Sequence, residues 1–210
     1  MVTAESTLRS EPDYTFDFCG GQLAIDFTNT VGSRGGAPEE HLRTFGDLVA
    51  WAEARGILSP AAATRLRREA AHRPAAARAA LAGALVLREA LYRVIEAAAA
   101  KRRPAPADLA IVNGQVRDTF SRMRLSGRRS RLELTTEDAD TRSVADPILT
   151  PVVRAAVELL TSDEIARVRT CADESCAWLF LDTTRNRTRR WCDMKSCGNR
   201  SKVRRFRGGQ

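Results

Sequence analysis

Four cysteines near the C-terminus constrain this chain more than any other feature of its sequence. Cys171 and Cys176 are separated by four residues, fifteen residues follow, and Cys192 and Cys197 repeat the same spacing. Paired thiolates at short spacing are the ligand set of a tetrahedral zinc site. So short a segment has little core of its own, and we therefore expect its folding to be coupled to metal binding.

The rest of the sequence favours zinc over disulfides for these cysteines. The first residues lack the basic and apolar regions of a secretion signal, and no run of about eighteen apolar residues indicates a membrane span. We therefore expect a cytoplasmic protein with no membrane partner, in which thiols stay reduced. Four thiolates fill the coordination sphere, which predicts one structural Zn²⁺ and no catalytic water. The alternatives are two disulfides or four unliganded cysteines.

Charge is concentrated at the same end of the chain. The 210 residues include 34 basic and 26 acidic ones, a net charge of +8. Residues 183–210 hold ten of the basic residues and one acid, whereas residues 1–182 hold 24 basic and 25 acidic residues. A basic end on a nearly neutral domain indicates a polyanionic partner.

Local patterns predict how the cysteine segment folds. Trp178–Leu181 reads as a strand, 183–188 as a polar turn, and Arg189–Trp191 as a returning strand. From Met194 or Ser196 onward the chain is expected to be helical, ending at the glycines 208–209. This order predicts a treble-clef-like four-cysteine zinc finger.

The predicted helix would display a basic ridge. Arg200, Arg204 and Arg207 stand four and then three residues apart and share one face, while Val203 and Phe206 are expected to pack inward. We expect the arginine ridge to contact phosphates, which would make binding salt-dependent.

Further basic residues precede the helix. The alternation Arg187-x-Arg189 would put two guanidinium groups on the same side of a strand. Trp178 and Trp191 either stack on bases or form the small core of the finger. The candidate nucleic-acid contacts are Arg187, Arg189, Arg190, Asn199, Arg200, Lys202, Arg204, Arg205 and Arg207.

The longer N-terminal part reads as a mainly α (α+β) domain with a minor β-hairpin or small sheet. We expect a flexible segment at 1–13, this domain at 14–165, and the finger with its basic tail at 166–210. Alternating patterns at 14–18 and 131–135 predict strands. Helical spacing and proline or glycine boundaries predict helices at 23–27, 45–55, 60–72, 74–101, 108–123 and 147–160.

Two parts of the sequence resemble known families. The run Cys197-Gly198-Asn199-Arg200, with the preceding Trp191-Cys192 and the Trp178–Asp182 strand, resembles the CGNR zinc-finger family. The stretch from Phe16 to Thr30, with its Gly20-Gly21 pair, resembles the start of the ABATE domain. The resemblance implies a bacterial, stress-responsive transcription regulator whose finger binds DNA. It also places Asn199 and Arg200 at the start of the finger helix, to contact nucleic acid or to lock the second cysteine pair.

Polar residues after the double glycine are candidates for a small-molecule site. Asp26, Asn29, Thr30 and Arg34 could converge on a pocket; alternatively, Asn29 and Thr30 end a helix and Asp26 pairs with an arginine. We find no nucleophile–base pair or phosphate loop, so we expect no enzyme. Cys19, far from the other cysteines in sequence, is expected to be a small buried hydrophobe.

These patterns together predict a DNA-binding transcription regulator whose front domain senses a ligand or stress signal. One alternative is an RNA-binding module, because basic zinc fingers also bind structured RNA. The other is a small-molecule-binding or enzymatic front domain with a purely structural finger. The sequence leaves open the DNA sequence read, the effector, the sign of regulation and the oligomeric state.

Overall fold

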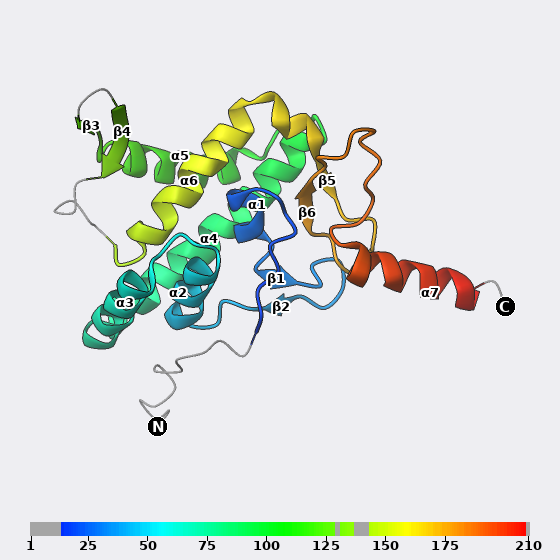
Figure 1. The fold of residues 1–210 in the computed structure, drawn as a ribbon, viewed down its shortest axis with the longest axis horizontal. Helices are drawn as coiled ribbons and strands as arrows, with labels where there is room; N and C mark the ends of the chain where they lie inside the picture. The colour runs from blue at the N-terminus through cyan, green and yellow to red at the C-terminus, as the bar shows by residue number, and fades with distance from the viewer. Residues whose placement is uncertain (1–13, 129–130, 137–142, 209–210) are drawn as a thin grey trace.

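The computed structural model describes residues 14–128, 131–136 and 143–208 as a mostly helical structure with three small antiparallel sheets (Figure 1). The helices are α1 (Leu23–Thr28), α2 (Phe45–Ala54), α3 (Pro60–His72), α4 (Pro74–Ala99), α5 (Pro106–Phe120), α6 (Asp146–Thr161), η3 (Asp163–Arg167), η4 (Met194–Gly198) and α7 (Asn199–Gly208). The strands are β1 (Val31–Gly32), β2 (Glu39–Glu40), β3 (Met123–Arg128), β4 (Arg131–Thr136), β5 (Val168–Thr170) and β6 (Leu179–Leu181). The expected flexible segment at 1–13 lies outside the described residues.

The predicted mainly helical class is confirmed. The helices begin at residues whose local chemistry favours a helix start. Helices α3, α4 and α5 each have proline at the first position, where no backbone N–H is needed. Ser59 caps α3, and Thr44 and Asp47 form a reciprocal capping box on α2. Gly56 follows α2 with a positive φ of 77°, a conformation that costs glycine little.

One predicted strand is wrong, and one predicted helix ends earlier than expected. Residues 14–18 form no strand: Tyr14 stacks on His41 with ring centroids 3.6 Å apart, and Phe16 and Phe18 pack on the core, so side-chain packing replaces a ladder. The helix expected to reach Met123 ends at Phe120. Met123 instead begins β3, which pairs with the predicted strand β4.

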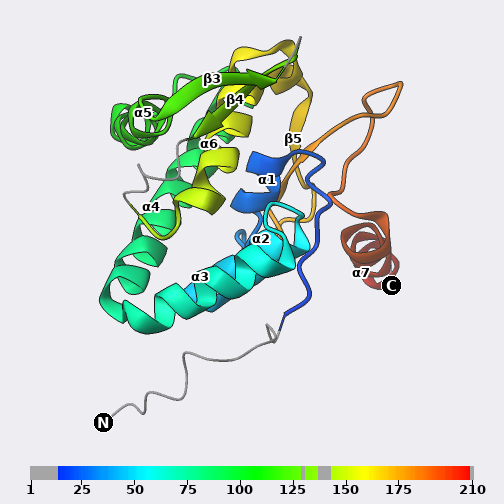
Figure 2. The same ribbon diagram turned by 60° about the vertical axis from the view of Figure 1, so that its left-hand side comes forward.

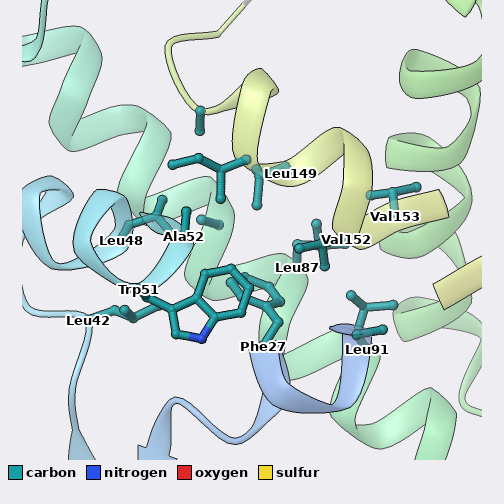
Figure 3. Packing of buried hydrophobic residues seen from close by; sticks show 14 of the residues in the cluster. Phe27, Leu42, Leu48, Trp51, Ala52, Leu87, Leu91, Leu149, Val152 and Val153 are labelled. Atoms are coloured by element: carbon teal, nitrogen blue, oxygen red, sulfur yellow. The ribbon is translucent and has the colours of Figure 1, made fainter. Parts of the chain in front are cut away.

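The core forms around the long helix α4. This helix packs against α1, α2, α3, α5 and α6. Figure 3 shows Phe27 and Trp51, whose ring centroids are 5.3 Å apart, next to Leu87 and Leu91 of α4. These side chains are almost fully buried, so the hydrophobic effect is the main force that holds the helices together.

Part of the C-terminal segment belongs to the same core. Val168 of β5 and Leu179 and Leu181 of β6 are buried in the cluster that the helices form. Strand β6 pairs antiparallel with β5, with Val168 opposite Leu181, so the predicted returning strand at 189–191 is wrong. Helix α7 extends away from the other helices (Figures 1 and 2). Within the described ranges no helix is long and apolar enough to cross a membrane.

Candidate zinc site and nucleic-acid interface

The four cysteines converge at one point, although four different local structures carry them. Cys171 follows β5, Cys176 precedes β6, Cys192 lies in the loop after β6, and Cys197 lies in η4. All four are buried, and their sulfur atoms lie within 4.8 Å of one another. We call residues 171–176 the first knuckle and residues 192–197 the second knuckle.

This cluster fits a zinc ion. Zn–S bonds of about 2.3 Å in a tetrahedron place neighbouring sulfurs about 3.8 Å apart. The Sγ atom of Cys192 lies 3.6 Å from that of Cys176 and 3.6 Å from that of Cys197. The backbone N–H of Cys192 donates to Cys171 Sγ at 3.4 Å, which suits a thiolate. The quartet can bind one Zn²⁺ and leaves no open coordination position, so the metal would be structural.

The sulfurs also compete for negative charge. A hydrogen bond with Cys176 lowers the pKa of Cys171 to about 2, and the same bond raises the pKa of Cys176. The pKa of Cys192 is raised too, first by its hydrogen bond with Cys171. A divalent cation bound by all four sulfurs removes this competition, because each thiolate then faces a positive charge.

The first knuckle is docked on the helical part of the chain, residues 14–167, which we call the body. The backbone N–H of Arg34 donates to the carbonyl of Cys176 at 3.2 Å, and the Tyr92 hydroxyl of α4 donates to the carbonyl of Ala177 at 2.8 Å. A Cβ atom on Gly35 would lie 1.7 Å from the carbonyl oxygen of Glu174. The body therefore touches the knuckle backbone directly, and glycine is required at the contact.

Asn29 joins the body to β6. Its Nδ2 donates to the carbonyl of Leu179 at 2.8 Å, and its Oδ1 accepts the Leu179 N–H at 3.1 Å. Beside it, Trp178 Nε1 donates to the carbonyl of Val31 at 2.6 Å, and the Leu181 N–H donates to the carbonyl of Gly20 at 2.8 Å. The buried side-chain amide of Asn29 thus satisfies the N–H and the C=O of Leu179 in β6, as the backbone of a neighbouring strand would.

The other candidate ligand residues are also bonded within the protein. Asp26 accepts from the Gly20 N–H at 3.0 Å and pairs with Arg55 at 2.8 Å; burial raises its pKa to about 6 although Arg55 opposes the shift. Thr30 donates to the carbonyl of Phe27 at 2.8 Å. Arg34 pairs with Glu89 of α4 at 2.7 Å. These contacts support the fold, and ligand binding at Asp26, Asn29, Thr30 and Arg34 stays a prediction.

Two arginines of α7 face the first knuckle. Arg200 Nε lies 3.1 Å and Arg204 Nη2 2.6 Å from the carboxylate of Asp173, whose side chain is fully buried. Arg200 Nη2 also donates to Cys197 Sγ at 2.9 Å. Although burial raises it, hydrogen bonds from Arg204 and Ser175 hold the pKa of Asp173 below its usual range. The predicted arginine ridge therefore includes a clamp between the two knuckles.

Asn199 has a local role as well. Its Nδ2 donates to the carbonyl of Lys195 at 2.9 Å, which caps a backbone group of η4. The Cys-Gly-Asn-Arg run thus supplies a metal ligand, a cap, and a guanidinium that joins the ligand to Asp173. The sequence-based interpretation of Asn199 and Arg200 as locking residues agrees with these contacts.

The remaining basic candidates divide into inward and outward groups. Arg189 Nε donates to the carbonyl of Trp191 at 3.0 Å, and its guanidinium lies 4.5 Å from the centre of the Phe180 ring. Arg187, Arg190 and Lys202 are exposed. No strand places Arg187 beside Arg189, because Arg187 has a positive φ of 51° in a turn. Arg205 and Arg207 belong to α7, and their side chains lie outside the structural description.

Two aromatic residues and a fifth cysteine surround the quartet. Trp178 and Trp191 pack against the cysteine cluster, as the core interpretation predicted. Cys19, expected to be a small buried hydrophobe, is half-buried and packs against this cluster. The extended segment before α1 brings it there, a long-range contact that spacing does not reveal.

Several positioning residues escaped the sequence interpretation. Asp173, Gly35 and Tyr92 hold the knuckles, yet none was singled out. Asp173 had one usable signal, since it lies inside the first cysteine pair. Gly35 and Tyr92 lie far from the cysteines in sequence and gave none.

The fold and site define a helical domain joined to a four-cysteine zinc finger. Two family models match: the ABATE family, described as "Putative stress-induced transcription regulator", over residues 21–163, and the CGNR zinc finger over residues 167–208. The chain belongs to the ABATE family and carries a CGNR zinc finger, which confirms the resemblance seen in the sequence. No curated protein matches the chain.

Proposed function

We propose that this protein is a cytoplasmic transcription regulator whose finger binds duplex DNA. One observation carries the proposal: exposed basic side chains gather on the finger and form no ion pair within the described residues. They include Arg185, Arg187, Arg190 and Lys202. Several arginines of the body, such as Arg34, Arg55 and Arg88, are instead paired with carboxylates. Unpaired basic groups on a rigid scaffold suit a phosphate backbone.

The zinc site supports this role without taking part in chemistry. Four thiolates would orient the second knuckle, and Asp173 fixes α7 on the first knuckle through Arg200 and Arg204. The basic surface therefore has one fixed orientation relative to the body. We propose binding without catalysis.

The test is a salt titration with a matched charge control. Replacing Arg185, Arg187 and Lys202 with alanine removes three outward charges from the finger. Replacing Arg65, Arg68 and Arg78 removes three exposed charges from the body. We expect only the finger variant to weaken binding to a labelled duplex, with the slope of log affinity against log salt falling by about 2.7 if each side chain contacts one phosphate. Equal effects of the two variants would contradict a finger interface.

The same titration separates DNA from RNA. We expect duplex DNA to bind more tightly than a structured RNA hairpin of equal charge at the same salt concentration. The reverse order would favour the RNA-binding alternative, because RNA is recognised by its wider minor groove and its unpaired bases.

The body offers a second candidate function, effector binding. A cavity of about 680 Å³ lies between α3, α4 and the start of α6, away from Asp26 and Asn29. Its size suits a small molecule. Gly83 of α4 lines this cavity, and a Cβ atom there would meet open space. We expect Gly83→Leu to reduce binding of the probe 8-anilinonaphthalene-1-sulfonate, and Gly114→Leu to leave it unchanged; equal binding by both variants would argue against this site.

A further inference from the structure

Helix α7 exposes two apolar side chains that were expected to be inside. Val203 is 48% exposed and Phe206 is 75% exposed. Single exposed apolar residues are ordinary. These two lie three residues apart on a ten-residue helix whose sequence contains Arg200, Lys202, Arg204, Arg205 and Arg207. An apolar strip between so many charges indicates a surface for a partner.

The contacts of α7 decide which side faces outward. Arg200 and Arg204 hold one side against Asp173. Asn199, Val203 and Phe206 stand four and then three residues apart and share a different side. An open groove of about 470 Å³ runs along α7 between these two sides, and Val203, Arg200 and Arg204 line it together with Lys195. Figures 1 and 2 show that the helix leaves the knuckles and extends away from the helices of the body.

The charge of α7 indicates which kind of partner contacts the apolar strip. A second copy of α7 would bring two strongly basic helices together, which like-charge repulsion opposes. Duplex DNA offers phosphates on both sides of a major groove about 12 Å wide, which admits an α-helix. On its floor the 5-methyl group of thymine is an apolar contact point. A basic helix with an apolar strip matches all three features.

We propose that α7 lies in the major groove of duplex DNA, with Val203 and Phe206 against thymine 5-methyl groups. Lys202, which neighbours the strip and is exposed, faces a phosphate on one wall of the groove. This inference rests on the proposed function, since it assigns the part of the DNA that the finger reads. It adds a preference for thymine to a surface that otherwise binds phosphates.

Removing the methyl group tests the proposal directly. Fluorescence anisotropy would compare two duplexes of alternating sequence, one of adenine and thymine and one of adenine and uracil on a deoxyribose backbone. Wild-type protein should bind the thymine duplex about fifteen-fold more tightly, since each of two methyl contacts contributes on the order of one buried CH₂ group, about four-fold in affinity. The Val203→Ala/Phe206→Ala variant should lose this preference, bind the uracil duplex within about two-fold of wild type, and keep the same salt slope.

The controls separate this inference from the proposed function. Val86→Ala removes an exposed apolar side chain from α4 and should change nothing. Circular dichroism and zinc content show whether the α7 variant keeps its helix and its finger. We expect both to persist, because alanine has a high helix propensity. Equal wild-type affinity for the two duplexes, or a preference that survives in the variant, would overturn the major-groove contact alone. No binding of wild type to either duplex at low salt would overturn the proposed function itself.

Discussion

The two knuckles share the same spacing but differ in what surrounds them. The first knuckle is held by the body through Arg34, Tyr92 and the close contact at Gly35. The second knuckle leads directly into α7, which extends away from the body. Between them lie the four sulfurs and the clamp at Asp173.

This difference shows what the metal would contribute to the molecule. A docked knuckle needs little help from zinc to stay ordered, because β6 already lies in the hydrophobic core. The second knuckle and α7 have few other supports, so they depend on the quartet and on Asp173. The zinc site therefore connects the docked first knuckle to the second knuckle, and so fixes the orientation of the basic helix α7 relative to the body.

The largest effect should follow loss of a ligand from the second knuckle. Cys197→Ala leaves three thiolates, and structural zinc supplies on the order of 10–16 kcal/mol in small fingers. We expect loss of zinc, rapid hydrogen exchange in α7 and loss of DNA binding, while the helical signal of the body persists. Zinc content, hydrogen exchange and circular dichroism measure these three. Slow hydrogen exchange of the α7 amides in the metal-free variant would contradict the dependence of the second knuckle on zinc.

The next prediction tests the docked side. Gly35→Ala would place a Cβ atom 1.7 Å from the backbone oxygen of Glu174, and that oxygen cannot move without moving the knuckle. We expect a loss of unfolding free energy of about 3 kcal/mol or more, measured by urea denaturation. Gly36→Ala is the matched control, because its Cβ would meet ordinary contacts at 3.7 Å or more. Similar stability of the two variants would mean that the first knuckle is not tightly docked.

The comparison also explains what the sequence could predict. The cysteine quartet could be predicted from its spacing, because each short Cys-x4-Cys pair brings two thiols together through local structure alone. Most helices follow from apolar spacing and from proline and capping residues at their starts. These signals are local, and the structure confirms them.

Contacts between distant segments could not be predicted in this way. Asn29 and Leu179 lie 150 residues apart, and Trp178 and Val31 lie 147 apart, so no local pattern links them. The placement of Cys19 beside Cys192 has the same origin. Val203 and Phe206 were expected to pack inward from their helical spacing, but both side chains are exposed on α7, because spacing shows that two residues share a face and not what covers that face.

A third prediction concerns Asp26. Its carboxylate accepts from the N–H of Gly20, and the carbonyl of Gly20 accepts from Leu181 of β6. Its pKa is raised from 3.8 to about 6 by burial, so its contribution to stability is complete below pH 3.8 and is lost as the pH rises through 6. The free energy of unfolding should therefore fall by about 2 to 3 kcal/mol between pH 4 and pH 7 through this group. Urea midpoints across this range should show a flatter profile for Asp26→Asn, and the exposed control Asp163→Asn should follow wild type. Parallel profiles for wild type and Asp26→Asn would contradict the raised pKa.

The smallest effect should come from the clamp at Asp173. Asp173→Asn keeps the shape of the side chain but removes the charge that holds Arg200 and Arg204. Both arginine side chains are 54% exposed and can return to water, so screening limits the loss to about 1 kcal/mol. We expect zinc to stay bound, because Arg200 still donates to Cys197, while the amides of α7 exchange several-fold faster. Unchanged exchange in α7 would show that the quartet alone fixes the helix, whereas loss of zinc would show that the clamp and the metal site form a single unit.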